Sequence, residues 1–208
     1  MARNQQRSEA MREQSRGAIL AAALEVFGES GFAQSTTAEI AEKAGVSKGL
    51  VFNYFPSKDA LLQALVEKML GEALDFWDAQ PWQGTPREQL LTWVDTAIAQ
   101  VLRRPGFYRL YFSLALQPGG SGAVERALRN LEERLTRYLQ RAEQLLQAAG
   151  SNQPALDARL LQCAINGLAQ VIVTSPSFTS EAGLVAVAPL RERLTALIGT
   201  YCPEREGR

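Results

Sequence analysis

The sequence has no histidine and only two cysteines, so the side chains that most often bind zinc or act as general bases are nearly missing. It contains neither a Cys-x-x-Cys motif nor a histidine pair, and we therefore expect no metal site and no cofactor. Cys163 lies in an apolar helical stripe, and Cys202 lies near the C-terminus. The simpler interpretation is one core thiol and one incidental thiol, and a redox-sensing pair is the alternative.

Long apolar runs and strand patterns are missing as well. No apolar run reaches the length of a membrane span, and the N-terminus has no apolar signal core, so we expect a cytoplasmic protein. The alternation of apolar and polar residues that is typical of strands never extends beyond a few positions. Ala, Leu, Glu, Gln and Arg dominate, and these residues favour helices. The 208 residues are therefore expected to form an all-α protein of about nine helices.

The chain also lacks a net charge, because it has 22 Lys and Arg residues and 22 Asp and Glu residues. Residues 1–60 carry seven of each sign, so the bulk charge argues neither for nor against nucleic-acid binding. Only the first residues are biased towards positive charge, with Arg3, Arg7, Arg12 and Arg16 against Glu9 and Glu13.

What the sequence does contain is a pair of short helices between residues 36 and 55. Thr36 and Glu39 have the spacing of a capping box, which predicts that a helix begins directly after Thr36. Gly45 is suited to end this helix, and Ser47 is suited to cap a second helix that runs to Phe55. Two helices joined by a short turn with glycine form a helix-turn-helix, whose second helix enters the major groove of DNA.

The second helix is expected to have an inner and an outer side. Val51 and Phe55 are four residues apart and are predicted to face the core. Gly49 has no side chain, which allows the start of the helix to approach DNA closely. The residues left to face outwards are Lys48, Gly49, Leu50, Asn53 and Tyr54.

This stretch resembles the DNA-binding motif of the TetR family of transcriptional regulators. The resemblance implies an N-terminal three-helix DNA-binding domain, followed by a helical domain for ligand binding and dimerisation. One departure is Phe52: many members have tyrosine there, so a phosphate-binding hydroxyl is lost. The resemblance rests on Thr36, Ile40, Ala41, Ala44-Gly45-Val46-Ser47, Gly49, Tyr54-Phe55, Ser57-Lys58 and Leu61-Leu62.

The resemblance and the helix geometry together indicate the DNA contacts. Lysine can pair with guanine, asparagine with adenine, and leucine can meet a thymine methyl group. Phosphate contacts are predicted for Thr36, Tyr54 and Lys58. Base-facing positions are predicted for Ser47, Lys48, Leu50 and Asn53, and Thr37 and Gly49 complete the predicted set.

The rest of the chain follows helical patterns. Residues 1–11 are expected to form a flexible arm, which is either untethered or places arginines on phosphates or in the minor groove. Residues 12–60 are expected to form the DNA-binding domain, and residues 61–208 the second domain. A helix that begins after Pro56 and runs to about Gln80 is expected to link the two as a rigid lever. Further helices are predicted near residues 12–30, 86–104, 107–116, 123–149, 154–173 and 187–201.

The second domain concentrates aromatic residues. In the family such a domain holds a small-molecule inducer, and an aromatic and aliphatic lining suits a ligand cavity. A filled aromatic core is the alternative. Asn166 stands in an otherwise apolar helix and needs hydrogen-bond partners. The predicted pocket residues are Trp77, Trp93, Phe107, Tyr108, Tyr111, Phe112, Tyr138 and Asn166.

The last two predicted helices carry more apolar surface than one face needs. Paired across a two-fold axis they would form a four-helix bundle, as in TetR-family dimers, and Gly167 would allow close approach. The alternative is that they only complete the core of one protomer. The predicted interface residues are Leu161, Ile165, Leu168, Ile172, Leu190, Leu194 and Leu197.

With the resemblance, these features indicate a homodimeric repressor that binds a palindromic DNA operator and is released by a small, largely apolar or aromatic ligand. An activator, or a regulator controlled by a partner protein, is the alternative within the same fold. An all-α enzyme is a remote alternative, because no nucleophile and base stand at a recognisable spacing.

Overall fold

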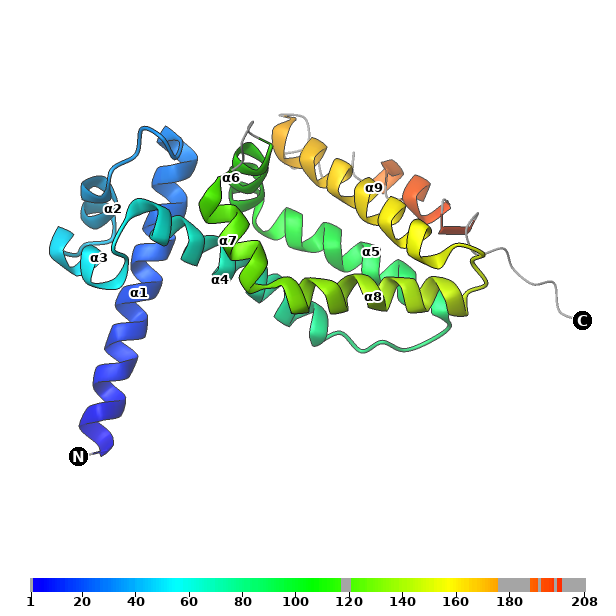
Figure 1. Cartoon of the computed structure of the whole chain (residues 1–208), viewed down its shortest axis with the longest axis horizontal. Helices are drawn as coiled ribbons and strands as arrows, with labels where there is room; N and C mark the ends of the chain where they lie inside the picture. Colours follow the sequence, from blue (N-terminus) through cyan, green and yellow to red (C-terminus); the bar gives the residue numbers. More distant parts are fainter. Residues whose placement is uncertain (1, 117–120, 176–187, 191, 197, 200–208) are drawn as a thin grey trace, which may run out of the picture. The chain divides into compact units, whose positions relative to one another are not determined.

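The computed structural model describes residues 2–116, 121–175, 188–190, 192–196, 198 and 199, so Leu197 and Cys202 lie outside the described residues. All regular structure within these ranges is helical, which confirms the all-α prediction. Figure 1 labels α1 (Ala2–Ser30), α2 (Thr37–Lys43), α3 (Lys48–Tyr54), α4 (Lys58–Asp78), α5 (Pro86–Arg103), α6 (Pro105–Ala115), α7 (Gly122–Asn130), α8 (Glu132–Ala148) and α9 (Pro154–Thr174).

The chain folds into two compact units. Unit 1 comprises Met1–Leu70 and Leu110–Asn130, and unit 2 comprises Gly71–Arg109 and Leu131–Arg208. The expected boundary at residue 60 therefore differs from the division in the structure. The first half of α4 stays with unit 1 because it is bonded to α7 there, through the Arg126 guanidinium and the Gln63 amide oxygen (2.9 Å).

Helix α1 begins at Ala2, so the first eleven residues are part of a long helix and not the flexible arm that was expected. Residues 2–16 contain no glycine or proline, and most of them favour helix, so nothing in the sequence ends the helix early. The Tyr54 hydroxyl of α3 also donates a hydrogen bond to the Arg12 carbonyl oxygen (3.1 Å). Further along α1, the buried side chains are Ile19, Leu20, Ala22, Ala23, Val26 and Phe27.

Helices α2 and α3 form the predicted helix-turn-helix. The Thr36 hydroxyl accepts from the Glu39 N–H (3.2 Å), and the Glu39 carboxylate accepts from the Thr36 N–H (2.7 Å), which completes the capping box. Gly45 has φ of 67°, a left-handed conformation that glycine adopts without a Cβ clash. The Ser47 hydroxyl then accepts from the Leu50 N–H (3.1 Å) and caps α3. Both predicted helices and both predicted caps are confirmed.

Helix α4 runs without interruption and contains residues of both units, as the predicted connecting helix should. In unit 1 its Glu67 carboxylate accepts a hydrogen bond from the Asn130 amide (2.6 Å). In unit 2 its Asp75 and Asp78 pair with Arg134 of α8, at 2.8 and 3.1 Å. Each half of the helix is therefore attached to its own unit by polar contacts.

The single helix predicted over residues 123–149 is divided into α7 and α8. The backbone leaves the helical conformation at Leu131, which has φ of −103° and ψ of 5°. Asn130 directly before the break is a weak helix former, and its side chain is engaged by Glu67. The break coincides with the change from unit 1 to unit 2.

Unit 2 is built around α5, α8 and α9, which pack against one another (Figure 1). The predicted Thr85–Glu88 capping box begins α5. Contrary to the expectation from sequence, α9 is long and apolar enough to span a membrane, with a mean hydropathy of 1.2. Its Leu161, Ile165 and Ile172 are buried, so a place in the core accounts for part of that composition, while Leu156, Leu160 and Val171 are exposed.

Candidate nucleic-acid interface

Helix α3 presents its first turn to solvent while its inner side holds unit 1 together. Val51 and Phe55 are buried, as predicted. Lys48 and Asn53 are exposed, and Leu50 is half-buried between them. Because the N-terminal residues of a recognition helix meet base edges in the major groove, this side of α3 is the surface suited to read DNA.

Polar groups remain available on this surface. The Ser47 oxygen accepts from the Leu50 N–H, but its own hydroxyl hydrogen stays free to donate. The Asn53 amide offers both a donor and an acceptor, the pair that adenine requires. A Cβ atom added at Gly49 would have only the Ser47 hydroxyl within reach, at 4.0 Å, so the helix start is open to close approach.

Phe52 has a partner on this surface that reasoning from sequence missed. Its ring is 43% exposed, and the Lys48 ammonium lies 5.9 Å from the ring centroid, within cation–π range. The spacing of four residues was the signal, since such residues are neighbours on a helix. Phenylalanine at this position therefore contacts Lys48, a lysine predicted to face bases.

Lys58 is not placed to bind a phosphate. Its ammonium donates to the carbonyl oxygens of Phe32 (2.6 Å), Ala33 (3.1 Å) and Ser35 (2.9 Å). An ammonium has three hydrogens, so all of them are used. Lys58 thus fastens the connection between α1 and α2, and its phosphate contact stays a prediction that these bonds argue against.

Thr36 and Tyr54 are engaged in a similar way. The Thr36 hydroxyl donates to the Glu39 carboxylate (2.9 Å), and the Tyr54 hydroxyl donates to the Arg12 carbonyl. Neither hydroxyl has a hydrogen left for a phosphate oxygen, which can only accept. Both hydroxyls are thus engaged within the protein in the absence of DNA, and their phosphate contacts stay predictions. Thr37, half-buried at the first position of α2, stays a prediction.

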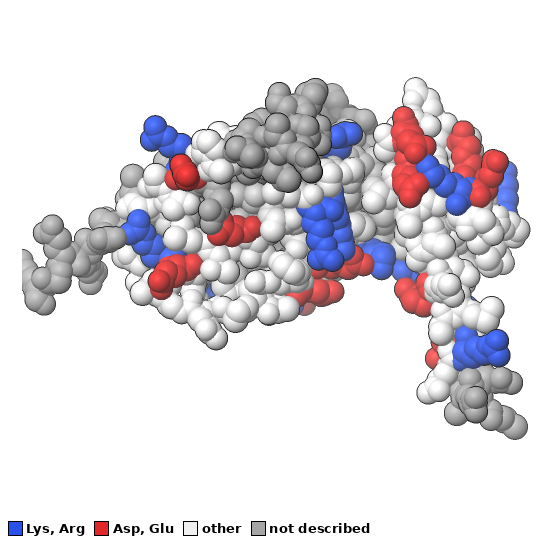
Figure 2. Space-filling model, turned by 180° about the vertical axis from the view of Figure 1, so that it is seen from behind, with Lys and Arg blue, Asp and Glu red and all other residues white. Residues whose placement is uncertain are grey.

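Residues 1–60 are neutral overall, but some of the cations that the structure describes there form ion pairs and others do not. Lys43 pairs with Glu25 (3.0 Å) and Glu29 (2.7 Å), and the hydrogen bond to Glu29 raises the pKa of Lys43. On the face seen in Figure 2, basic and acidic side chains are interspersed over the described residues. Within the described residues of α1 and α3, the cations without an ion pair are Arg7, Arg12, Arg16 and Lys48.

Three of the predicted pocket residues pack against one another in unit 2, and whether they line a cavity or form a filled core stays open. Trp93 and Tyr138 stack with ring centroids 4.9 Å apart, and Trp77 packs edge-on against both, at 6.0 and 4.7 Å. Trp82 joins them, 4.2 Å from Trp77. Burial raises the pKa of Tyr138, and Tyr108 adds to the shift.

The other predicted pocket residues lie elsewhere. Phe107 and Tyr108 form a ring pair in unit 2, whereas Tyr111 and Phe112 form one in unit 1. Asn166 is exposed on α9, where its side-chain oxygen accepts from the Gln162 amide (2.8 Å), so the expectation of a pocket-lining polar group is corrected. The predicted set is therefore not brought together within one unit.

The predicted interface residues of α9 divide by burial. Leu161, Ile165 and Ile172 face the core of unit 2 and cannot reach a partner, which corrects their assignment. Leu168 is half-buried, Leu194 is buried, and Leu197 lies outside the described residues. Cys163 is exposed and not the core thiol that was expected. The exposed large apolar residues on α9 and beyond it are Leu156, Leu160, Val171 and Leu190.

Comparisons with known proteins agree with this geometry. The family model for bacterial regulatory proteins of the tetR family matches residues 19–65. The chain is 42% identical over 76 residues to the HTH-type transcriptional regulator BetI of Rhizobium meliloti (strain 1021), covering 36% of this chain and 37% of that protein. It is 47% identical over 60 residues to the HTH-type transcriptional regulator RutR of Escherichia coli (strain K12), covering 29% of this chain and 26% of that protein. The matches thus span well under half the length of these curated relatives.

Solved structures extend the likeness to most of the fold. A transcriptional regulator from Rhodococcus sp. Rha1 superposes with a TM-score of 0.71 at 23% identity, covering 89% of this chain and 95% of that one. The regulator FadR from Bacillus subtilis, in complex with stearoyl-CoA, superposes with a TM-score of 0.66 at 22% identity, covering 87% and 96%. The family model and the curated relatives show that residues 19–65 are similar to the DNA-binding part of bacterial regulatory proteins of the tetR family, in agreement with the helix-turn-helix geometry.

Proposed function

We propose that the protein is a cytoplasmic repressor that binds a palindromic operator as a homodimer and leaves it when a small, largely apolar or aromatic ligand binds unit 2. The observation that supports DNA reading is the outer side of α3, where Lys48 and Asn53 are exposed above a buried Val51. Lys48 and Asn53 are the base-reading residues in this proposal, with Leu50 and the Ser47 hydroxyl beside them.

The dimer is supported by an apolar stripe on α9 that nothing in the described part of the protomer covers. Its members recur every three or four residues, which places them on one side of the helix. Beside the stripe lies an open recess of about 300 Å³, lined by Ala164, Gly167, Leu168, Val171, Leu190, Arg193 and Leu194. In a two-fold dimer this stripe meets its own copy. The stripe comprises Leu156, Leu160, Cys163, Gly167 and Val171.

Gly167 offers a sharp test of the dimer. A Cβ atom at this position meets nothing within 4 Å in the protomer, so Gly167→Leu is expected to fold with unchanged or slightly higher stability. Across a close helix pair the same side chain clashes, and the variant should be monomeric by sedimentation. Gly28→Leu is the matched control, because Gly28 also has open space within a helix and lies in unit 1.

Cys163 provides a second measurement on the same face. In a Cys202→Ser background, a short thiol crosslinker is expected to join two chains through Cys163, and Gly167→Leu should abolish the product. A protein that binds its operator but is monomeric at micromolar concentration, with no crosslinked product, would contradict the proposed dimer.

The operator follows from the dimer. Two copies of α3 related by a two-fold axis read two inverted half-sites about one helical turn apart, or slightly more. Selection of bound duplexes from a random pool tests this directly. We expect an inverted repeat, and a single half-site as the tightest ligand would contradict it.

A ligand for unit 2 is supported by two buried indole groups. Trp77 Nε1 and Trp93 Nε1 have no hydrogen-bond partner among the described residues, and such a donor costs about 1–3 kcal/mol when it stays unpaired. A ligand that carries an oxygen acceptor on an apolar body could satisfy them. The FadR protein of this fold binds stearoyl-CoA, which makes that compound a reasonable first probe.

The three tryptophans of the chain, at 77, 82 and 93, all belong to unit 2, so their fluorescence reports ligand binding without a label. A ligand that acts through this unit should change the fluorescence and lower operator affinity over the same concentration range. Equal operator affinity with and without a compound removes it from consideration. Higher affinity would instead favour a co-repressor.

Helix α4 is the proposed route from ligand to DNA. Its second half is held in unit 2 by Arg134, and its first half is held in unit 1 by Asn130. In this proposal ligand binding displaces α4 and changes the spacing of the two α3 helices, so that both half-sites can no longer be engaged together. Arg134→Ala is therefore expected to weaken the ligand's effect on DNA while ligand binding is retained.

A further inference from the structure

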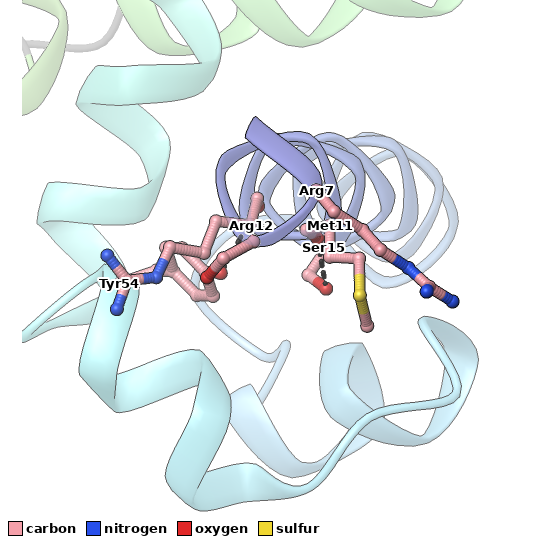
Figure 3. Close-up of a pocket in the computed structure, with 6 residues that line it drawn as sticks. Arg7, Met11, Arg12, Ser15 and Tyr54 are labelled. Atoms are coloured by element: carbon pink, nitrogen blue, oxygen red, sulfur yellow. Dashed lines mark hydrogen bonds between the residues drawn. The ribbon is translucent and has the colours of Figure 1, made fainter. Parts of the chain in front are cut away.

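The N-terminal part of α1 presents a basic side next to the end of the recognition helix. Figure 3 shows Arg12 reaching towards Tyr54 while Arg7 points to the other side, with Met11 and Ser15 between them. These side chains surround an open recess of about 350 Å³, which is lined by Arg7, Ser8, Met11, Arg12, Ser15 and Tyr54.

Two contacts fix the direction of this helix relative to α3. The hydroxyl of Tyr54, the last residue of α3, donates to the Arg12 carbonyl oxygen at 3.1 Å. One turn later the Arg16 guanidinium lies 5.6 Å from the ring centroid of the buried Phe55. The residues before Arg12 therefore continue from a fixed point at the end of the recognition helix.

The arginines and glutamates on this part of α1 point in different directions. Arg7 and Arg12 are exposed, and neither forms an ion pair with any described residue. Glu9 and Glu13 do not line the recess. At about 100° per residue they point roughly 120–160° away from Arg7, and Arg12 lies between the two directions, about 60° from Glu9. The recess thus has a guanidinium group on either side and the hydroxyl of Ser8 between them, and such groups bind phosphate oxygens.

We propose that Arg7 and Arg12 bind the phosphate backbone of the DNA that flanks each half-site. This rests on operator binding by α3 and adds contacts outside the helix-turn-helix. The proposal also supplies what that motif lacks, because the hydrogens of Thr36, Tyr54 and Lys58 are committed within the protein. The arginines are five residues apart, roughly 7.5 Å along the helix, so they can reach different phosphates.

The length of the helix sets the size of the added contact. The residues from Ala2 to Met11 extend α1 by about 15 Å, at about 1.5 Å per residue. DNA rises about 3.4 Å per base pair, so this length corresponds to roughly four base pairs. Each half-site is therefore expected to need about four base pairs of duplex beyond the positions that α3 reads, whatever their sequence.

The first test is the salt dependence of binding to an operator selected with the wild-type protein. Each phosphate contact contributes about 0.9 to the slope of log affinity against log salt. The Arg7→Ala/Arg12→Ala variant removes two arginines from each protomer of a dimer, so the magnitude of its slope should be lower by about 3.6. Between 50 and 200 mM salt, the advantage of the wild type over the variant should shrink roughly 100-fold.

A matched control separates contact from general charge. Arg103→Ala/Arg137→Ala removes two exposed arginines of unit 2 and changes the net charge by the same amount. This variant should keep the wild-type slope. Both variants replace arginine with a stronger helix former on an exposed helix, so their circular dichroism should match that of the wild type.

The second test trims the flanking duplex. Shortening the operator to the two half-sites should lower its affinity for the wild-type protein. The same shortening should not change its affinity for the Arg7→Ala/Arg12→Ala variant. Tyr54→Phe removes only the hydroxyl that holds Arg12, and it should reduce the flank dependence while leaving the base preferences unchanged. Tyr54 thus acts here as a positioning residue.

The outcomes are distinguishable. A double variant that keeps the wild-type slope and the flank dependence overturns this inference and leaves reading by α3 intact. A lower slope that is equal on trimmed and flanked duplexes would place the arginines on the half-sites themselves, which also overturns it. A wild-type protein that selects no operator would instead overturn the proposed function.

Discussion

Replacing Lys58 by methionine should destabilise unit 1 without removing a DNA contact. The family motif suggested a phosphate ligand at this position, but the ammonium lies among three carbonyl oxygens of residues 32–35, the nearest at 2.6 Å. It also lies 4.6 Å from the Phe32 ring centroid. Methionine keeps most of the aliphatic length and removes the charge, the donors and the cation–π contact together.

The size of the effect follows from these contacts. A hydrogen bond to a charged group contributes about 1.5–3 kcal/mol when it is buried. The bonds to Phe32 and Ser35 are part-buried and are taken at the lower limit, while the exposed bond to Ala33 is taken as negligible. The cation–π contact adds about 0.5–1 kcal/mol. We therefore expect Lys58→Met to lower the unfolding free energy of unit 1 by roughly 3.5–4 kcal/mol.

The assay uses the placement of the tryptophans. Tryptophan fluorescence follows unit 2, whereas amide hydrogen exchange over residues 31–43 follows unit 1. Lys58→Met should increase exchange in this segment and keep the wild-type salt slope of DNA binding in conditions where it is folded. Lys48→Met is the counterpart. Because the Lys48 ammonium is exposed, its removal should change the unfolding free energy by no more than about 0.5 kcal/mol. If Lys48 contacts DNA, the variant should also have a lower salt slope of DNA binding. The reverse pattern, with a lower slope and full stability for Lys58→Met, would refute the structural role.

Three further predictions concern separate sites. Asn53→Ala should relax the preference for adenine at one operator position by about 1–3 kcal/mol and leave the salt slope unchanged, as measured by binding to a panel of single-base variants. Hydrogen bonding to the Thr85 backbone N–H lowers the pKa of Glu88 below its ordinary 4.5, so its stabilising contribution is present above that pH and is lost as pH falls through the folded-state pKa. The difference in unfolding free energy between the wild type and Glu88→Gln, measured by tryptophan fluorescence, should therefore become smaller as the pH is lowered. Trp93→Phe should change stability by only about 1 kcal/mol, because the lost packing is offset by removal of an unpaired N–H; a loss above about 3 kcal/mol would show that the N–H has a partner.

Most of the helices could be predicted from the sequence because their signals are local. Thr36, Gly45 and Ser47 act within four residues of themselves, and the structure has the caps and the turn where the sequence placed them. The same holds for Thr85 and Glu88 at the start of α5. In each case one side chain and one nearby backbone group decide where a helix begins or ends.

The roles that could not be predicted depend on residues far apart in the chain. Lys58 bonds to carbonyl groups 23–26 residues away, and Tyr54 bonds to one 42 residues away. For α9 the periodic pattern was recognised, but apolar residues occur on both sides, and only packing shows that Leu161 faces the core while Leu160 does not. The extent of α1 was predictable in principle, because nothing between residues 2 and 16 stops a helix.

The structure shows which lysines of the neutral segment 1–60 are engaged within the protein. Lys43 is paired with two glutamates, and Lys58 is committed to carbonyl groups, so only Lys48 remains on the motif to meet DNA. One cation per protomer cannot supply the steep salt dependence of an operator-binding protein, because phosphate contacts dominate affinity. On the proposal made above, affinity comes largely from Arg7 and Arg12 at the start of α1, while α3 supplies sequence choice. It follows that exchanging residues 2–12 for a neutral helix of equal length should weaken binding to every duplex alike and leave the selected operator sequence unchanged.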